Sequence, residues 1–459
     1  MCQSISRSVL AAVLSLGIAT PPLVAQVVAI THVTVVDPTA SPARDVTVII
    51  RDGVIAAIQP SQRTSVPRGA TVVSARGKFL IPGLWDMHVH SLLEGGAWAL
   101  AGYVAHGVTT VRDMGGRFET VDSLRRAIAA GQLAGPRVFA VGLQIEHAAS
   151  MQYIRTKGSS DVQAAAPFDR LKLSTPQAAT RAVDSLSRLG VDFIKGRNFQ
   201  DAPTYWAIAA AARRAGKLFV GHPPVGIDPI ALADSGQRTV EHWYTPDNLP
   251  KLAPAEYDRI IAAYRRNGTA FVPTLSAWND HRFVVDTMRR RLDAALADPR
   301  SAQLPGSLLR HWQTLLDERM RDTDGRPAAA AELTGWNKAL DGLGTEIGKL
   351  STAGVLVLAG SDMPFALYPG EALHRELRNL VRYAGFTPRQ ALAAATLNPA
   401  RSLGMQDSLG SIAAGKIADL VLLDGNPMVD IGNVRRVNRV MRGGRWLWVR
   451  GMARPGVGQ

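Results

Sequence analysis

Residues 82–90 read PGLWDMHVH, an apolar run that begins after Pro-Gly and ends on two histidines one residue apart. In a β-strand, side chains at positions i and i+2 point to the same side. His88 and His90 can therefore face the same space and hold one metal ion together. Because exposed histidines also produce this pattern by chance, its weight depends on what stands elsewhere in the chain.

Seven further short apolar runs follow, separated by alanine-rich stretches with helical patterning. Repeated alternation of strand and helix is typical of βα units on parallel strands, and eight units predict an α/β fold, the closed (β/α)8 or TIM barrel. We expect the barrel to cover residues 82–405. Its eight strands should lie close to residues 84–90, 108–113, 137–141, 191–195, 218–222, 239–242, 270–274 and 355–362.

Strand patterns occupy both ends of the chain. Asp52-Gly53 lies between two apolar runs, which predicts a tight hairpin, and residues 417–448 return to strand patterning with a Gly-Gly turn. We expect the two ends, residues 26–81 and 406–459, to form one small β-sandwich domain beside the barrel.

A long interval before the last predicted strand, about residues 277–350, carries amphipathic helical patterns. An insertion after the seventh strand emerges at the end of the barrel where active sites form, so we expect a lid that helps to select the substrate. The alternative is a helical decoration on the outside of the barrel.

The first 25 residues have the pattern of a secretory signal peptide. Arg7 precedes an apolar run at residues 9–16, and the small residues up to Ala25 offer a cleavage point. The run is too short to span a membrane, so we expect a periplasmic or secreted protein with no membrane span. A buried N-terminal helix is the alternative.

The composition excludes several classes of protein. The 459 residues are 46% hydrophobic and 20% charged, which is typical of a globular chain, and the single cysteine excludes an internal disulfide and a cysteine-based zinc site. The net charge of +14 invites a nucleic-acid interpretation. However, the basic residues are spread along the chain without a nucleic-acid-binding motif, so we expect a solvated basic surface and no nucleic-acid partner.

Three more potential metal ligands end predicted barrel strands, namely His222, His242 and Asp362. Barrel active sites form at the carboxyl ends of the strands, so these side chains should meet His88 and His90. The chain has 10 histidines in all, and four of them at predicted strand ends are hard to explain by core packing.

Lys195 ends the apolar run at residues 191–194. Burying a bare ammonium is costly, and desolvation together with nearby metal charge favours the neutral amine. A neutral amine can capture CO₂ as a carbamate, a bidentate anion able to bridge two divalent ions. The alternative is a lysine whose ammonium reaches solvent or pairs with a carboxylate.

The chain resembles the amidohydrolase superfamily, in the branch similar to imidazolonepropionase-like proteins and metal-dependent dipeptidases. The resemblance spans about residues 27–450. It rests on an ordered set of motifs: PGLWDMHVH (82–90), GVTTVRDMGG (107–116), GPRV (135–138), FIK (193–195), EH (241–242), VPTL (272–275), GSD (360–362), ATLNPA (395–400) and GSIAAGKIADL (410–420). The order His-x-His, Lys, His, His, Asp matches the family's two-metal subtype with a carboxylated lysine.

This resemblance implies two divalent metal ions, with Zn²⁺ as the first expectation and Mn²⁺ or Co²⁺ as alternatives, because imidazole and carboxylate accept all three. His88, His90 and Asp362 would hold the more buried ion. His222 and His242 would hold the other.

The resemblance also implies a mechanism. Carboxylated Lys195 and a hydroxide would bridge the two ions, which lie ~3.5–4 Å apart in such sites and polarise the substrate carbonyl. Asp362 would take the proton as the hydroxide attacks and pass it to the leaving nitrogen. Glu241 and Asp86 border ligands but face the other way by alternation, so we expect them to support the site.

Two departures from the relatives concern the substrate. Residues 144–147 read QIEH where relatives often carry Gly-Gly-His, and two prolines follow His222 where many relatives have alanine. We expect His147 to take the catalytic, substrate-contacting role of the family histidine. We expect Arg197 and Asn198 to bind a substrate carboxylate. The alternative for all three is that they are loop residues with solvent partners.

The leading interpretation is a secreted hydrolase of a C–N bond in a small-molecule substrate: an amide, a dipeptide or an N-acyl amino acid. The same metal pair could also open a cyclic amide or hydrolyse a lactone or a phosphoester. A deaminase is disfavoured because the family's one-metal deaminases do not need the lysine. Outside enzymes, the alternative is an inactive binding protein on the same fold, against which the intact ligand set argues. The substrate, the metal and homo-oligomer formation stay open.

Overall fold

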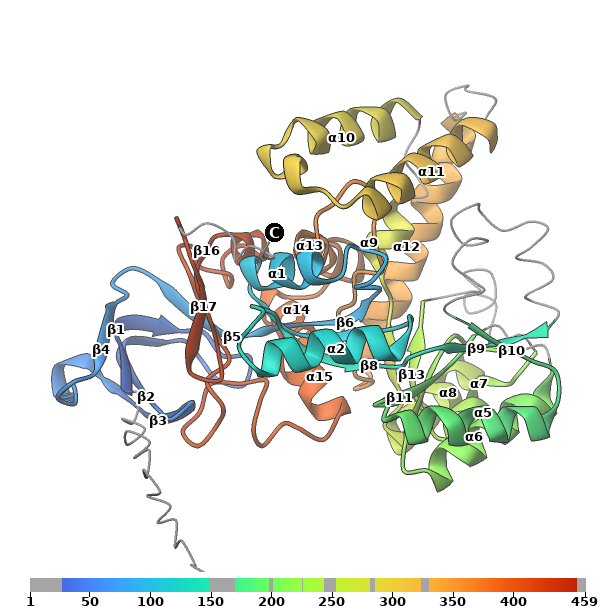
Figure 1. Cartoon of the computed structure of the whole chain (residues 1–459), viewed down its shortest axis with the longest axis horizontal. Coiled ribbons are helices and arrows are strands. Elements are labelled where there is room, and N and C mark those ends of the chain that lie inside the picture. The colour runs from blue at the N-terminus through green and yellow to red at the C-terminus, as the bar shows by residue number, and fades with distance from the viewer. Residues whose placement is uncertain are drawn as a thin grey trace, which may run out of the picture.

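The computed structural model describes residues 27–148, 170–197, 201–224, 226–242, 253–280, 285–322 and 330–451. Figure 1 shows the blue N-terminal strands beside the red C-terminal strands β16 and β17, next to an α/β body of strands and helices. The predicted signal peptide and Asn198 lie outside the described residues.

Both ends of the chain join in one mixed sheet of eight strands, in the order β17-β16-β15-β5-β1-β2-β3, with β4 beside β1. β5 links the two ends because it pairs parallel with β1 and antiparallel with β15. The predicted sandwich is not confirmed, because the strands of the two ends are hydrogen-bonded edge to edge into a single sheet. The strands are β1 (Val27–Val35), β2 (Ala43–Arg51), β3 (Val54–Pro60), β4 (Thr71–Ser74), β5 (Phe79–Pro82), β15 (Leu420–Leu423), β16 (Val437–Arg442) and β17 (Arg445–Val449).

The hairpin between β2 and β3 is confirmed. Arg51 pairs with Val54, which leaves Asp52 and Gly53 as the turn, with φ of 49° and 82°. Two positive φ angles are what a two-residue type I′ turn requires. The sheet has its own hydrophobic core with side chains from both chain ends, among them Val28, Ile30, Val48, Ile50, Leu80, Leu420, Leu422 and Met441.

The middle of the chain forms two parallel sheets. The first has the order β6-β7-β8, and the second has the order β10-β9-β11-β12-β13-β14. Seven predicted runs coincide with these strands, whereas β9 and β10 were not predicted. The strands are β6 (Leu84–Val89), β7 (Val108–Asp113), β8 (Arg137–Ala140), β9 (Gln144–His147), β10 (Arg170–Leu173), β11 (Phe193–Gly196), β12 (Leu218–Gly221), β13 (Gln237–Glu241) and β14 (Ala270–Val272).

Single backbone hydrogen bonds join the two sheets at their margins. On one side, Asp192 N donates to Ala140 O at 2.8 Å, next to β8 and β11. On the other, Phe271 N donates to Leu356 O at 2.8 Å, and Met87 N donates to Ala359 O at 2.9 Å. The eighth predicted run therefore lies between β14 and β6, where its one parallel bridge joins Val357 to Phe271.

The helices between these strands follow from local sequence signals, as α5 (Pro176–Leu189) illustrates. Thr175 accepts a hydrogen bond from Ala178 N at its start, and Gly190 ends it with a left-handed φ of 92°. Its buried side chains, Ala179, Val183 and Leu186, recur at helical spacing and pack into the main core. Neighbouring helices are α1 (Ala97–Ala105), α2 (Phe118–Ala129), α6 (Ala202–Arg214), α7 (Pro229–Asp234) and α8 (Pro254–Asn267).

The predicted insertion is helical. It contains α9 (Leu275–Asp280), α10 (Val285–Ala297), the 3-10 turn η3 (Pro299–Gln303), α11 (Gly306–Asp322) and α12 (Ala330–Thr352). Figure 1 shows α10 and α11 together at the top of the molecule. The remaining elements are α13 (Glu371–Ala384), α14 (Pro388–Ala394), α15 (Leu397–Ser402), η1 (Ser61–Arg63) and η4 (Ile431–Arg435). Among the described residues, no helix is both long and apolar enough to cross a membrane.

Candidate metal centre

The parallel strands bring the predicted ligands to one end of the sheets. They lie at or just after strand ends: His88 and His90 at β6, Lys195 in β11, His222 after β12, His242 after β13, and Asp362 after residues 355–361. Since carboxyl ends of parallel strands share one edge, six residues spread between positions 88 and 362 of the chain can converge there.

Asp362 lies at the centre of the group. Its Oδ1 is 3.6 Å from His88 Nε2 and 3.5 Å from His90 Nε2. Its Oδ2 is 3.6 Å from His242 Nδ1. Ligand atoms of His88, His242 and Asp362 all lie within 4.8 Å of one another. The tightest donor set therefore includes His242, which the sequence assigned to the other ion.

The remaining two predicted ligands lie around this set. The imidazole ring of His222 meets that of His242 edge-on, with ring centroids 5.0 Å apart. Lys195 is fully buried, and its Nζ donates to Met114 O at 2.8 Å. The ammonium charge of Lys195 lowers the pKa of both His88 and His90, after the larger effect of their burial.

The donor geometry fits a divalent ion. At 3.5–3.6 Å, the carboxylate and the imidazoles are too far apart for hydrogen bonds. Ligands on a tetrahedral ion at ~2.0–2.1 Å are themselves about 3.3 Å apart. Among the described residues, His88 Nε2, which faces Asp362, is a buried atom without a hydrogen-bond partner. Such atoms are costly to bury unless they have a ligand.

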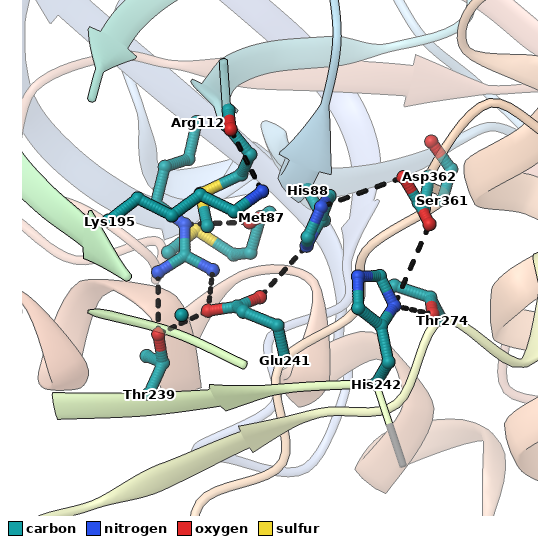
Figure 2. Close-up of polar contacts among 12 residues, drawn as sticks. Met87, His88, Arg112, Lys195, Thr239, Glu241, His242, Thr274, Ser361 and Asp362 are labelled. Carbon is teal, nitrogen blue, oxygen red and sulfur yellow. Dashed lines mark hydrogen bonds and ion pairs between the residues drawn. The ribbon is translucent and has the colours of Figure 1, made fainter. Parts of the chain in front are cut away.

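A buried polar chain holds His88. Figure 2 shows the Arg112 guanidinium between Met87, Thr239 and Glu241. It donates to Met87 O at 2.7 Å, to Thr239 Oγ1 at 2.9 Å and to Glu241 Oε1 at 2.7 Å. Glu241 Oε2 in turn accepts from His88 Nδ1 at 2.9 Å. This leaves Nε2 of His88 as the atom that faces Asp362, and it confirms the predicted supporting position of Glu241.

Asp362 is held by backbone contacts. Its N–H donates to His88 O at 2.9 Å, and Asp86 Oδ1 accepts from Ser361 N at 2.9 Å. The φ angles are 49° at Asp362 and 47° at Met363. Two successive non-glycine residues in the left-handed region are uncommon and are found where function over-determines the backbone.

Thr274 and Glu94 also contact ligands, and the sequence did not single them out. His242 Nδ1 lies 2.6 Å from Thr274 Oγ1, and the φ angles are 56° at His242 and 47° at Thr274. Glu94 Oε1 accepts from His90 N at 3.2 Å, while its Oε2 accepts from Tyr103 at 2.5 Å. The available signal for Glu94 was a carboxylate just after the His-x-His stretch.

Burial keeps the imidazoles neutral. Desolvation is the largest cause that lowers the pKa of His90 to about 3 and that of His242 to about 4. It also holds the pKa of His88 and His222 well below their usual range. Neutral imidazole is the form that binds a metal, so these four side chains are ready to act as ligands at neutral pH.

Lys195 and Asp362 shift in a complementary way. Burial, followed by the positive charge of Arg197, lowers the pKa of Lys195 to about 7. Burial alone raises the pKa of Asp362, but electrostatic interactions with His242 and His90, followed by the positive charges of Lys195 and Arg197, outweigh it and bring the pKa below its usual range. A carboxylate and a partly neutral amine therefore coexist in one site.

The structure places two of the three predicted substrate residues. His147 ends β9, half-buried, in register with Leu173 of β10. Arg197 follows β11, and its guanidinium contacts Gln144 Oε1 and Glu146 Oε2, both at 3.0 Å. The carboxylate of Glu146 therefore already pairs with Arg197, which we predicted from the sequence to bind a substrate carboxylate. Asn198 lies outside the described residues.

A candidate metal site at the carboxyl ends of parallel strands is typical of active sites in α/β enzymes, and comparison with known proteins identifies the family. The model of the amidohydrolase family matches residues 79–447, so the chain belongs to this family. The chain is therefore a hydrolase that acts on carbon–nitrogen bonds, in a family that depends on metal ions.

Individual relatives are distant but similar over most of their length. The chain is 25% identical to an imidazolonepropionase of Symbiobacterium thermophilum over 385 residues, which cover 81% of this chain and 82% of the relative. It is 23% identical to an ochratoxinase of Aspergillus niger over 472 residues, covering 91% and 85%. A solved structure of a candidate prolidase from Bifidobacterium longum matches with a TM-score of 0.68 and 26% identity, covering 95% and 96%.

Proposed function

We propose that this protein is a binuclear, metal-dependent amidohydrolase that cleaves the amide C–N bond of a dipeptide or an N-acyl amino acid. One observation carries the proposal: four buried histidines, a buried lysine and a carboxylate converge at the carboxyl ends of the parallel strands. Neutral imidazoles beside a carboxylate match what a divalent ion needs.

We further infer that the strands form one closed (β/α)8 barrel. The backbone hydrogen bonds at both margins of the two parallel sheets support closure, because they connect β8 with the segment before β11, and β14 with β6 through residues 355–359. Closure would fix the six ligands on a rigid frame.

One ion would be held by His88, His90 and Asp362, in which both imidazoles lie 3.5–3.6 Å from the carboxylate. The second ion would be held by His222 and His242, with the two oxygens of Asp362 facing histidines of both groups. When bound, the ion pair lowers the pKa of a water molecule and polarises the scissile carbonyl.

Lys195 would bridge the two ions as a carbamate. With a pKa of about 7, Lys195 carries a neutral amine in a large fraction of the molecules at neutral pH. The amine nitrogen attacks the carbon of CO₂, one proton leaves, and the resulting carbamate is an anion with two oxygen donors. This change replaces a buried cation, which is costly among neutral imidazoles, with a metal ligand.

Asp362 would move the proton. Its lowered pKa keeps the carboxylate ionised, and its side chain is 25% exposed, whereas that of His88 is fully buried. Its side chain is also more exposed than those of His90 (11%) and His242 (10%), so Asp362 is the ligand of this group most open to a substrate. It would accept a proton as the carbonyl is attacked and deliver it to the leaving nitrogen.

For the substrate, similarity to the candidate prolidase from Bifidobacterium longum supports a peptide-type amide. His147 would contact the substrate from the end of β9. Arg197 would act mainly on the electrostatics of the site, because Glu146 already neutralises it, although its charge still lowers the pKa of Lys195.

The test is a substrate panel with metal control. Purified protein should be stripped with a chelator, reloaded with Zn²⁺, Mn²⁺ or Co²⁺, and assayed on dipeptides, N-acyl amino acids, cyclic amides, lactones and phosphoesters. We expect metal-dependent release of amino acid from the first two classes. Metal-loaded protein that hydrolyses only lactones or phosphoesters would contradict the amide assignment, and binding without turnover of any class would favour a binding protein.

We also propose export after cleavage near Ala25, on the basis of the N-terminal sequence alone. N-terminal sequencing of protein recovered from a periplasmic or culture-supernatant fraction should begin near residue 26. Protein that retains Met1 and fractionates with the cytoplasm would refute export.

A further inference from the structure

The helical insertion packs on the loop that follows Asp362. We call residues 363–370 the Asp362 loop. Phe365 and Tyr368 of this loop are buried in a hydrophobic cluster separate from the main core. The other buried members of the cluster come from α10 and α11: Val285, Met288, Leu292, Ala295, Leu308, Trp312 and Leu316.

Tyr368 is surrounded by the insertion on several sides. Its hydroxyl donates to Ala295 O of α10 at 2.8 Å. The Trp312 ring of α11 meets it edge-on, with ring centroids 5.9 Å apart. The Arg300 guanidinium of η3 lies over its face, 4.2 Å from the ring centroid. These contacts fix both the position and the orientation of the ring.

Arg300 also binds the residue that follows the C-terminal end of the Asp362 loop. It donates to Glu371, the first residue of α13, and to Asp298 Oδ2 at 2.6 Å within the insertion. Glu371 Oε1 lies 3.5 Å from His106 Nε2 at the end of α1. One arginine therefore connects the insertion to the residue that follows the Asp362 loop.

The loop that follows His90 meets the insertion as well. A Cβ on Gly95 would lie 2.3 Å from Cγ of Pro305, which precedes α11, so the Pro305 ring packs directly on the backbone at Gly95. Trp98 contacts Tyr368, with ring centroids 6.1 Å apart. The loop after His90 and the loop after Asp362 therefore both pack against the helical insertion.

The backbone of the Asp362 loop needs such support. Asp362, Met363 and Ala366 all have positive φ, at 49°, 47° and 50°. Each such residue costs on the order of 1 kcal/mol or more and persists only where its surroundings over-determine it. Inside the loop, that constraint comes from Phe365 and Tyr368, whose partners belong to the insertion.

We propose that the helical insertion positions Asp362 through the Asp362 loop, with Tyr368 and Arg300 as positioning residues. The insertion is then part of the catalytic machinery and not an outer decoration. This inference rests on the proposed function for its effect on catalysis, but its structural half concerns this chain alone.

The first test is hydrogen exchange on metal-free protein. Arg300→Ala removes both the ring contact and the link to Glu371. We expect peptides covering residues 361–370 to exchange about 5-fold faster or more, since a lost support lowers the local opening free energy. The matched control is Arg290→Ala, an exposed arginine of α10 whose side chain contacts Thr287 of the same helix. It should leave exchange in the loop unchanged.

The second test is metal affinity by chelator competition, followed by kinetics. If Asp362 is loosened, Arg300→Ala should weaken the apparent affinity for Zn²⁺ or Mn²⁺ about 10-fold and lower kcat by about 10-fold or more with a smaller change in KM. Arg300→Lys keeps the charge but not the planar face, so it should restore only part of each loss.

Tyr368→Phe guards against a variant that fails to fold, because it retains the ring and removes only the hydroxyl bond to Ala295. It should change exchange and affinity in the same direction by a smaller factor. Faster exchange confined to residues 285–322, with metal affinity and kcat at wild-type values in both variants, would overturn the proposal. Wild-type protein that binds no metal would refute the proposed function, while the exchange data would still decide whether the insertion holds the loop.

Discussion

His88 Nε2 and Asp362 Oδ1 lie 3.6 Å apart, yet different kinds of contact fix the two residues in place. His88 lies in strand β6, is fully buried, and is fixed by Glu241, which Arg112 holds in turn. Asp362 follows a segment with a single bridge, has a left-handed backbone, and is 25% exposed. Side-chain bonds determine the first position, whereas backbone and loop packing determine the second.

This difference indicates a division of labour. A residue that only binds an ion gains from a rigid setting, because no reorganisation follows. A residue that also exchanges a proton with a substrate must be reachable from solvent. The His88 side should therefore act mainly on metal affinity, whereas the Asp362 side should act on both metal affinity and turnover. Four substitutions, from the largest expected effect to the smallest, test this division.

Lys195→Ala should break both sides at once. It removes the proposed bridge between the two ions, so we expect activity to fall by more than about 10²-fold and metal content to drop below two ions per chain. Added acetate or another short carboxylate should restore part of the activity. Lys217→Ala is the control. The Lys217 ammonium donates to Val191 O, which lies just before β11, at the opposite end of the strand from the ligands. Full activity in Lys195→Ala would exclude the carbamate.

Glu241→Gln should affect the His88 side selectively. The amide keeps the shape but removes the charge that orients His88 and pairs with Arg112, so metal affinity should fall about 10–100-fold. Measured with saturating metal, kcat should change much less. The control is Glu346→Gln, a carboxylate that pairs with Lys349 on α12. A large loss of kcat at saturating metal with unchanged affinity would contradict the division between the two sides.

Gly360→Ala should disturb the contact between the two sides. A Cβ at residue 360 would lie 2.8 Å from both His88 Cβ and Val272 Cγ1, so the two segments must move apart. Overpacking of this kind costs about 1–3 kcal/mol in the free energy of unfolding. Gly342→Ala, in α12 with nothing within 4 Å of the added atom, should instead stabilise by about 0.5–1 kcal/mol. Equal melting temperatures for the two variants would show that the contact is not tight.

Glu376→Gln should change how the free energy of unfolding depends on pH. Glu376 lies on α13, the helix that follows the Asp362 loop. Glu376 of α13 accepts from Leu275 N and Ser276 N at the start of α9, and burial raises its pKa to about 7. The folded state therefore binds this proton more tightly than the unfolded state. Its contribution to stability is fully present below about pH 4.5 and is lost as the pH rises through about 7. Between pH 5 and 8, wild type should lose stability relative to the variant, by the order of 1 kcal/mol. The opposite trend in urea unfolding would refute the assignment.

Much of the parallel-sheet region could be predicted from the sequence, because most of its strands are largely buried and appear as short apolar runs, and β6 and β7 are buried at every position. Residues 108–113 match β7 at both ends. β9 and β10 were missed since each has four residues and charged positions such as Glu146 and Arg170. The sandwich was predicted because strand patterns do not reveal whether β5 and β15 meet edge to edge or face to face.

The convergence of the predicted ligands could be expected from the sequence, because the carboxyl ends of parallel strands lie at one edge of a sheet. His222 and Asp362 each follow such a strand end or apolar run, although they are far apart in the chain. The residues that hold these ligands in place could not be predicted from the sequence. A buried charge in an apolar run, as at Arg112, signals a partner but does not name it, and Glu241 lies 129 residues away. The constraint on Asp362 was hidden for the same reason, since Tyr368 and Ala295 are 73 residues apart.

The most direct test of the central claim is a crystal structure of the metal-loaded protein with anomalous data collected at the absorption edge of the bound metal. We predict two anomalous peaks about 3.5–4 Å apart. One should lie against His88, His90 and Asp362 and the other against His222 and His242, with extra density for a carbamate on Lys195. A single peak, or peaks outside these six residues in enzyme that hydrolyses its substrate, would contradict the binuclear account.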